Sequence, residues 1–140
     1  MDRERRNMSD RGVTRVDPTG LTRAPHFSQA VRIDTPAKVV YVAGQVAGDG
    51  FGAVDCDAFE AQMNAVFDRI ATILEASGMG LTDLVKINGF ITNRSNVPIW
   101  RKVVFERLGH VRPASTLVVT ELTDPKLLVE IDAVAAQGQQ

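Results

Sequence analysis

Two carboxylates, Glu130 and Asp132, interrupt the apolar run from Leu128 to Ala135 near the end of the sequence. A charge in such a run is costly to bury unless hydrogen bonds or a functional role offset the cost. With the two-residue period of a strand, both carboxylates share one face and the apolar residues between them share the other. Such a glutamate has one of two roles. It is a solvent-exposed charge at a strand edge, where it discourages aggregation, or it holds a water molecule for a reaction.

The other side chains with catalytic potential lack the partners that they need. His26 and His110 are the two histidines, and neither has Cys or carboxylate neighbours at metal-ligand spacing, so we expect no metal site. Cys56 stands between two aspartates, which disfavour a reactive thiolate. Ser28 and Ser115 lack the Gly-x-Ser-x-Gly elbow and a recognisable base. Metal-dependent and covalent catalysis are therefore not expected.

The composition indicates one globular domain without a strong charge. The chain has 140 residues and a net charge of -1, which argues against nucleic acid or an anionic membrane as a partner. No apolar run approaches the roughly 18–20 residues of a membrane span, and the first residues lack the apolar stretch of a signal peptide. A single cysteine excludes an intrachain disulfide. We therefore expect a cytoplasmic protein.

The order of apolar patterns predicts a disordered N-terminal extension over 1–12, a domain over 13–136 and a C-terminal tail over 137–140. Strands are expected over 13–16, 27–33, 38–46, 84–92, 114–120 and 127–135. One helix begins with a capping box at Asp57 and stops at Gly78 and Gly80, where left-handed backbone is expected. The other has Pro98 in its first turn and ends at Gly109.

These elements predict an α+β fold in which two helices pack on one face of a single mixed sheet. The other face of the sheet needs a cover as well. Residues such as Val40, Val42, Ile87 and Val129 are expected on that face, and self-association is the simplest way to bury them.

Several short motifs resemble those of the RidA/YjgF family, small proteins that hydrolyse reactive imines. The motifs are Phe27-Ser-Gln-Ala-Val31, Ala43-Gly-Gln45 and Pro113-Ala-Ser-Thr116, followed by Glu130, and the resemblance covers 25–136. It implies a chorismate-mutase-like fold, a homotrimer, small-molecule sites in the clefts between subunits, and no cofactor. In the family, the glutamate that matches Glu130 holds the water that attacks the imine carbon. One carboxylate and a few backbone donors suffice for that reaction.

The chain departs from the family at residues that contact an imino acid. The family motif reads Pro-Ala-Arg-Ser and its Arg binds the substrate carboxylate, but Ser115 stands at this position, followed by Thr116. A serine hydroxyl cannot replace a bidentate guanidinium contact. Phe27 replaces a tyrosine, and Ala43 replaces a serine. The expected substrate is therefore an imine or enamine other than a simple 2-imino acid, in a pocket shaped by Gly44, Ser115 and Thr116.

Two arginines could supply the missing charge. Arg112 precedes the motif directly, and Arg101 lies on the second helix, near the cleft position where the family often has an asparagine. The alternative for each is a solvated surface arginine. The leading hypothesis is hydrolysis of an imine or enamine by a water that Glu130 activates. The competing hypothesis is a non-catalytic trimer whose clefts bind a small ligand for regulation or sequestration.

Overall fold

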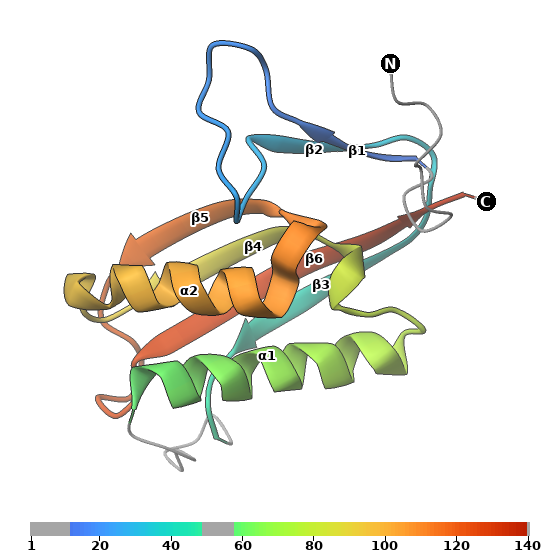
Figure 1. Ribbon diagram of the computed structural model, residues 1–140. Helices are drawn as coiled ribbons and strands as arrows, with labels where there is room; N and C mark the ends of the chain where they lie inside the picture. Colours follow the sequence, from blue (N-terminus) through green and yellow to red (C-terminus); the bar gives the residue numbers. More distant parts are fainter. Residues whose placement is uncertain (1–11, 49–57, 140) are drawn as a thin grey trace.

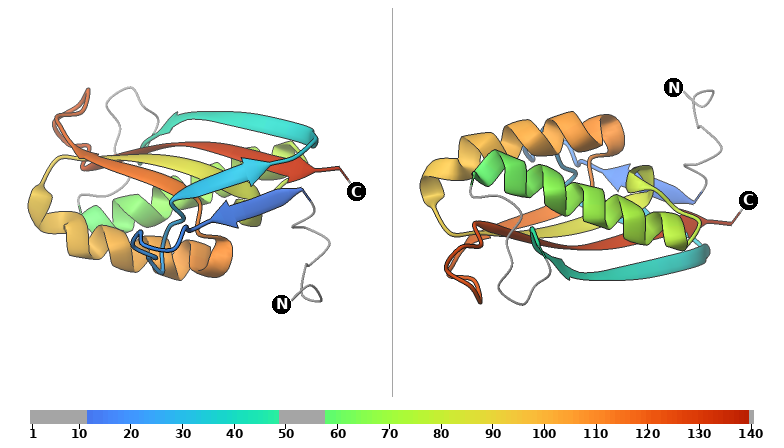
Figure 2. Two further views of the ribbon diagram at one scale, coloured as in Figure 1. Left: turned by 90° about the horizontal axis from the view of Figure 1, so that it is seen from above. Right: turned by 90° about the horizontal axis from the view of Figure 1, so that it is seen from below.

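The computed structural model describes residues 12–48 and 58–139, which form a four-stranded sheet, a two-stranded sheet and two α-helices (Figure 1). The strands are β1 (Val13–Val16), β2 (Ala30–Ile33), β3 (Pro36–Gln45), β4 (Leu84–Ile91), β5 (Ala114–Val119) and β6 (Val129–Gly138), and the helices are α1 (Phe59–Ala76) and α2 (Val97–Leu108). Both helices lie on the same side of the larger sheet (Figure 2). The predicted α+β arrangement is confirmed.

The larger sheet has the order β3-β6-β4-β5, which places β6 between two antiparallel neighbours. β4 and β5 run parallel, because α2 carries the chain back between them. Alternate residues of β6 from Val129 onward are buried, and the residues between them are half-buried. β4 repeats the pattern at Ile87, Gly89 and Ile91. The sheet thus has a core face under the helices and an opposite face, which we call the open face.

The residues predicted to drive self-association lie on the core face instead. Val42, Ile87 and Val129 are at most 5% exposed and belong to the cluster under the helices, and Val40 packs against that cluster. The expectation of an uncovered face at these residues was wrong, because a two-residue period does not tell which face the helices cover. On the open face, Tyr41 of β3 is 80% exposed.

α1 follows from a stripe of apolar residues at three- and four-residue steps, which is buried against the sheet. Its N-cap is Ala58, which makes no side-chain hydrogen bond to the helix. The predicted capping box at Asp57 lies outside the described residues. Gly78 has the predicted left-handed backbone, with φ +71°. Gly80 is extended, with φ -143°, so the second predicted stop was wrong.

α2 has Pro98 in its first turn and ends at Gly109, as predicted. Its Trp100 packs directly on Gly89 of β4. A Cβ added to Gly89 would stand 2.1 Å from Cη2 of Trp100, so the absence of a side chain is what lets the helix lie this close to the strand.

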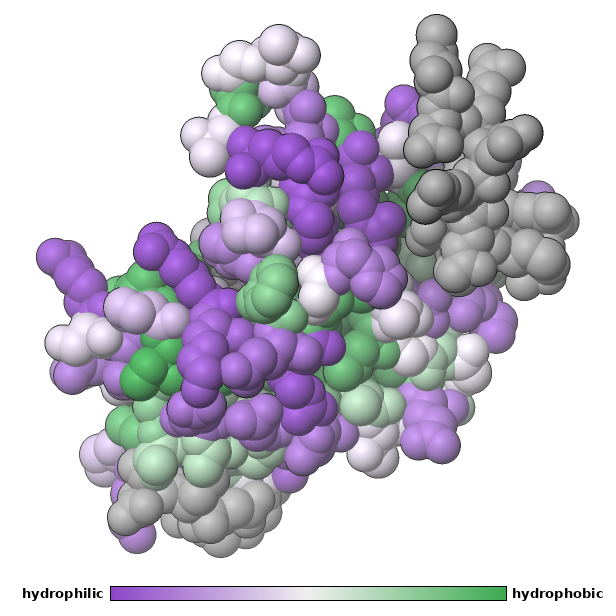
Figure 3. Space-filling model, viewed as in Figure 1, coloured by the Kyte–Doolittle hydropathy of each residue, from purple (hydrophilic) through white to green (hydrophobic). Residues whose placement is uncertain are grey.

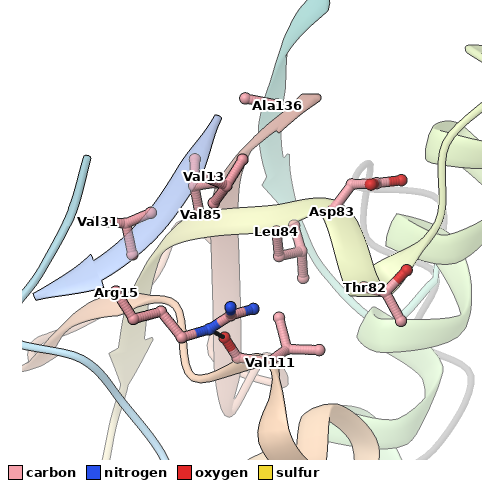
Figure 4. A pocket seen from close by; sticks show the side chains of 9 residues that line it. All are labelled: Val13, Arg15, Val31, Thr82, Asp83, Leu84, Val85, Val111 and Ala136. Carbon is pink, nitrogen blue, oxygen red and sulfur yellow. Dashed lines mark hydrogen bonds between the residues drawn. The ribbon is translucent and has the colours of Figure 1, made fainter. Parts of the chain in front are cut away.

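β1 and β2 pair with each other, whereas β3 pairs with β6. The strand predicted over 27–33 begins only at Ala30, and Ser28 forms an isolated bridge with Ala114. A cavity of about 10 Å³ lies between the β1–β2 pair and the start of β4 (Figure 4). Arg15 donates a hydrogen bond to the carbonyl of Val111 at this cavity. This space suffices for one water molecule at most, so it is a gap in the packing between the two sheets and is too small for a ligand.

The ends of the described chain lie side by side. β6 continues through Gln137 and Gly138, two residues beyond the predicted end of the domain. Gly12, assigned to the N-terminal extension, accepts a hydrogen bond from the amide of Asp34 at 2.7 Å. Residues 1–11 and Cys56 lie outside the described residues. No helix within 12–48 or 58–139 is long and apolar enough to cross a membrane.

We expect Gly89→Ala to destabilise the protein by about 1–3 kcal/mol, because the added methyl group collides with the buried Trp100 ring. Gly80→Ala is the matched control, since a Cβ there meets no atom closer than 4.0 Å. Chemical denaturation of both variants measures the difference. Equal stabilities would show that α2 can shift away from β4 at no cost.

Candidate functional site

The open face gathers side chains, most of them polar, from all four strands of the larger sheet. It is formed by Tyr41 of β3, Glu130, Asp132 and Val134 of β6, Lys86, Asn88 and Phe90 of β4, and Thr116 and Val118 of β5. In register, Asp132, Asn88 and Thr116 lie side by side, and Glu130 lies beside Phe90. The predicted common face of Glu130 and Asp132 is confirmed by their alternation with buried residues.

A β-bulge in β3 brings Gly44 against Glu130. The pairing with β6 shifts between Val42 and Gln45, so that Ala43 and Gly44 stand opposite a single residue. A Cβ on Gly44 would stand 2.8 Å from Oε2 of Glu130, so the carboxylate lies against bare backbone. In the described part of the chain, no group donates a hydrogen bond to this carboxylate. Glu130 is therefore able to bind a water molecule or a ligand.

Two side-chain hydrogen bonds organise the rest of the open face. Nδ2 of Asn88 donates to Oδ1 of Asp132 at 2.7 Å, and Nζ of Lys86 donates to Oγ1 of Thr116 at 3.1 Å. Sequence reasoning assigned no role to Lys86 or Asn88. Their alternation with apolar residues in the strand was the available signal, because it places both on the same face of β4.

A second group of predicted site residues lies on the helix side of the sheet edge. Ser115 pairs in register with the core-face residue Ile87 and therefore points away from Glu130. Phe27 contacts His26 edge-on, with ring centroids 4.8 Å apart. Burial lowers the pKa of His26, and the positive charge of nearby Arg101, exposed on α2, lowers it further. His26, to which the sequence assigned no site role, lies beside this group.

Arg112 is buried, and its guanidinium binds groups of the same chain. It donates to Oδ2 of Asp17 at 2.8 Å and to the carbonyl oxygens of Ala24 and Phe27 at 3.0 Å and 2.9 Å. The residue is 8% exposed. The sequence offered Arg112, besides Arg101, as a possible replacement for the missing carboxylate-binding arginine. In this protomer the Arg112 guanidinium is bound by the segment before β2. Sequence proximity to the Pro-Ala-Ser-Thr motif could not reveal the distant Asp17.

The Asp17–Arg112 ion pair is shielded from solvent, with side chains that are 7% and 9% exposed. The amide of Gln29 also donates to Asp17, at 3.2 Å. Burial by itself raises the pKa of Asp17, but the hydrogen bonds from Arg112 and Gln29 outweigh this effect and hold the pKa below its usual value. Asp17 therefore stays ionised and ties the segment between β1 and β2 to the start of β5.

The predicted site residues thus fall into separate groups in one protomer. Ala43, Gly44, Thr116 and Glu130 lie at the open face, Phe27, Arg101 and Ser115 lie on the helix side, and Arg112 lies in the buried ion pair. The surface over α2 is mainly hydrophilic (Figure 3). No three described His, Cys, Asp or Glu residues are grouped closely enough to hold a metal ion.

Comparisons with known proteins agree with this architecture. The family model described as Endoribonuclease L-PSP matches residues 20–137. A RutC family protein of Pyrococcus horikoshii is 27% identical over 110 residues, 78% of this chain and 85% of that protein. The crystal structure of RidA from an Antarctic Psychrobacter is 31% identical, with a TM-score of 0.64 over 79% of this chain and 87% of that chain. A Rid family protein from Yersinia pestis has a TM-score of 0.78 and 24% identity, over 89% of this chain and 98% of that chain.

The lowered pKa of Asp17 predicts a contribution to stability that depends on pH. An aspartate with a depressed folded-state pKa stabilises the fold above its unfolded value of about 3.9, and this contribution is lost as the pH falls through the lower folded-state value. Asp17→Asn should therefore lower Tm at pH 7, and the gap to the parent should narrow at pH 3. Thermal unfolding at both pH values measures it. The exposed Asp34→Asn, which loses a pair with Arg32, is the control and should change Tm little. A difference in Tm between Asp17→Asn and the parent that is equal at both pH values would contradict the lowered pKa of Asp17.

We expect Gly44→Ala to displace the Glu130 carboxylate while changing the free energy of unfolding by less than about 1 kcal/mol. The reason is that the three atoms nearest to the new methyl group all belong to the Glu130 side chain, whose end can rotate away. The side-chain carboxyl signals in carbon-13 NMR provide the measurement. The Glu130 signal should move and that of Asp83, outside the site, should not. An unmoved Glu130 signal would show that the carboxylate does not depend on Gly44.

Proposed function

Since this chain belongs to the Endoribonuclease L-PSP family, which includes the RidA and YjgF proteins, we propose that it hydrolyses a reactive imine or enamine, with Glu130 activating the attacking water. One observation carries the proposal. The Glu130 carboxylate lies on the open face against the backbone of Gly44, and no donor among the described residues occupies it. A carboxylate in this state is suited to accept a proton from water.

The chemistry requires little beyond this carboxylate, because the carbon of a C=N bond is already electrophilic. The water oxygen bonds to that carbon, Glu130 takes a proton from the water, and the π electrons move to nitrogen. Glu130 then passes its proton to nitrogen. The hydroxyl proton also moves to nitrogen as the C–N bond breaks, so that ammonia leaves and a carbonyl forms. One imine and one water thus yield one carbonyl compound and one ammonia. An enamine enters the same sequence after taking a proton on carbon.

The substrate in this proposal is not a simple 2-imino acid. Ser115 stands where relatives with the Pro-Ala-Arg-Ser motif have an arginine, and its side chain is on the helix side of the sheet. Arg112, the neighbouring cation, is bound to Asp17 and to two carbonyl groups. A substrate carboxylate would therefore lack a guanidinium partner within the protomer.

We further propose a homotrimer with the ligand in the clefts between copies. The exposed Tyr41 on the open face supports association, because a large aromatic side chain is costly to leave in water. The separation of predicted site residues between the open face and the helix side supports it as well. A neighbouring copy can bring Phe27 and Ser115 to a Glu130 that its own chain keeps on the opposite face. A cytoplasmic location stays a prediction.

A ribonuclease activity, to which the family description refers, is not the activity that we propose. RNA binding requires a basic surface, whereas the chain has a net charge of -1 and its open face carries two carboxylates. The second candidate is a non-catalytic trimer that binds a small ligand. Ser115 at the position of the missing arginine favours it, because a site can lose turnover and keep its ligand.

If Glu130 activates water, Glu130→Gln should lower turnover by about 100-fold or more, the usual contribution of a general base. The variant preserves volume and hydrogen-bonding capacity, so the oligomeric state and Tm should not change. The assay generates propan-1-imine with an amine oxidase and follows its loss in competition with semicarbazide.

Glu75→Gln on the exposed part of α1 is the matched control and should keep parental turnover. A Glu130→Gln rate within a few-fold of the parent would remove Glu130 from the reaction. A parent protein without any turnover, which still binds a ligand at the open face, would favour the non-catalytic candidate.

A further inference from the structure

We infer that the Glu130 site selects a ligand that carries a positive charge and no carboxylate, with Asp132 as the specificity-determining residue. The inference rests on the proposed function, because it concerns the same site, and it names the class of imine that the site takes. It follows from the charges of the open face, from the hydrogen bonds of Asp132, and from a neighbouring cavity.

The open face carries an excess of negative charge. Glu130 and Asp132 are two residues apart on one face of β6, which places their Cα atoms about 7 Å from each other. Lys86 is the basic residue of the open face, and its ammonium group is turned toward Thr116, to which it donates a hydrogen bond at 3.1 Å. A bound cation would lie near two carboxylates, whereas a bound carboxylate would be repelled by them.

Asp132 is held in place and still has an oxygen for a ligand. Asn88 donates to Oδ1 of Asp132 at 2.7 Å, which fixes the plane of the carboxylate. Among the described residues, no group donates to Oδ2. Asp132 can therefore accept a hydrogen bond from a ligand N–H group, and a charge-assisted bond of this kind is stronger than a neutral one.

The arginines of the neighbouring segments do not change this balance within the protomer. Arg112 is buried and bound to Asp17. Arg101 lies on α2 beside His26, on the helix side of the sheet. Within the protomer, the guanidinium groups that would attract a carboxylate are therefore kept off the open face.

A cavity of about 340 Å³ lies next to the Glu130 end of the sheet, a size typical of small-ligand sites. It is lined by Thr92, Glu121, Leu122, Asp124, Pro125 and Leu127. The amide of Thr92 donates to the carbonyl of Leu128, two residue pairs along the strands from the Glu130–Phe90 pair. The charged residues of this lining are both carboxylates, so a ligand that extends from Glu130 toward this cavity is favoured when it is a cation with a small apolar body.

A protonated imine without a carboxylate has these properties. Its N–H groups suit Oδ2 of Asp132, and its carbon is more electrophilic than that of a neutral imine. Water adds to this carbon as Glu130 takes a proton, and the π electrons neutralise the nitrogen. After the proton returns to nitrogen, the C–N bond breaks and ammonia leaves. The remaining hydroxyl proton leaves with ammonia as ammonium, so protonated imine and water give a carbonyl compound and ammonium.

Binding of two inert probes of equal size tests the charge preference. Propylammonium and propanoate are titrated into the full-length protein at pH 7, and amide NMR shifts report both affinity and position. We expect propylammonium to bind roughly ten-fold more tightly, with shifts on β4 and β6. Asp132→Asn, which keeps an oxygen acceptor for Asn88, should bring the two affinities close together. Asp34→Asn removes an exposed charge elsewhere and should leave the ratio unchanged.

Lys86→Met provides a second variant that works in the opposite direction. It removes the positive charge of the open face, so the preference for propylammonium should increase. Three outcomes would each overturn the inference: equal or tighter binding of propanoate, a ratio that Asp132→Asn does not change, or shifts confined to residues away from β4 and β6.

Hydrolysis of two imines separates this inference from the proposed function. Propan-1-imine lacks a carboxylate, and 2-iminobutanoate has one. Faster turnover of propan-1-imine supports both proposals, and faster turnover of 2-iminobutanoate overturns the charge preference while supporting hydrolysis. Turnover of neither imine, together with tighter binding of propylammonium, overturns the hydrolytic function and leaves the charge preference supported.

Discussion

The alternation of β6 is the constraint on which the rest of the structure depends. This strand lies between β3 and β4, and each apolar residue that it buries under the helices commits the next residue to the open face. A shift of register by one residue would bury Glu130 and Asp132 and expose the core. The pairing that builds the core therefore also decides where the carboxylates stand.

Close approaches on both faces keep this strand in register. On the core side, the buried Gln62 of α1 donates to the carbonyl of Lys126 and accepts from the amide of Leu128, which holds the chain where it enters β6. On the open side, the bulge in β3 presses Gly44 against Glu130. Contacts from α1 and from β3 thus fix the same short stretch of β6 that carries Glu130. The geometry of the site is therefore set by the packing of the core.

The distribution of positive charge sets the character of the open face. The arginine nearest to the Pro-Ala-Ser-Thr motif is used to hold the segment between β1 and β2, through a buried pair with Asp17. Removal of either partner would leave a buried charge without compensation, so Arg112 is not free for a ligand. Two carboxylates consequently dominate the open face, and we propose that ligand charge is the property that this site discriminates.

By itself, the sequence determined the two helices, most strand positions and the common face of Glu130 and Asp132, because each of these follows from local periodicity. Its motifs also led to the family. Only the tertiary structure decided which sheet face the helices cover, that Asn88 holds Asp132, and that Arg112 is bound by a residue 95 positions earlier in the chain. Such contacts depend on strand order and register, which join segments far apart in the sequence and which no local pattern encodes.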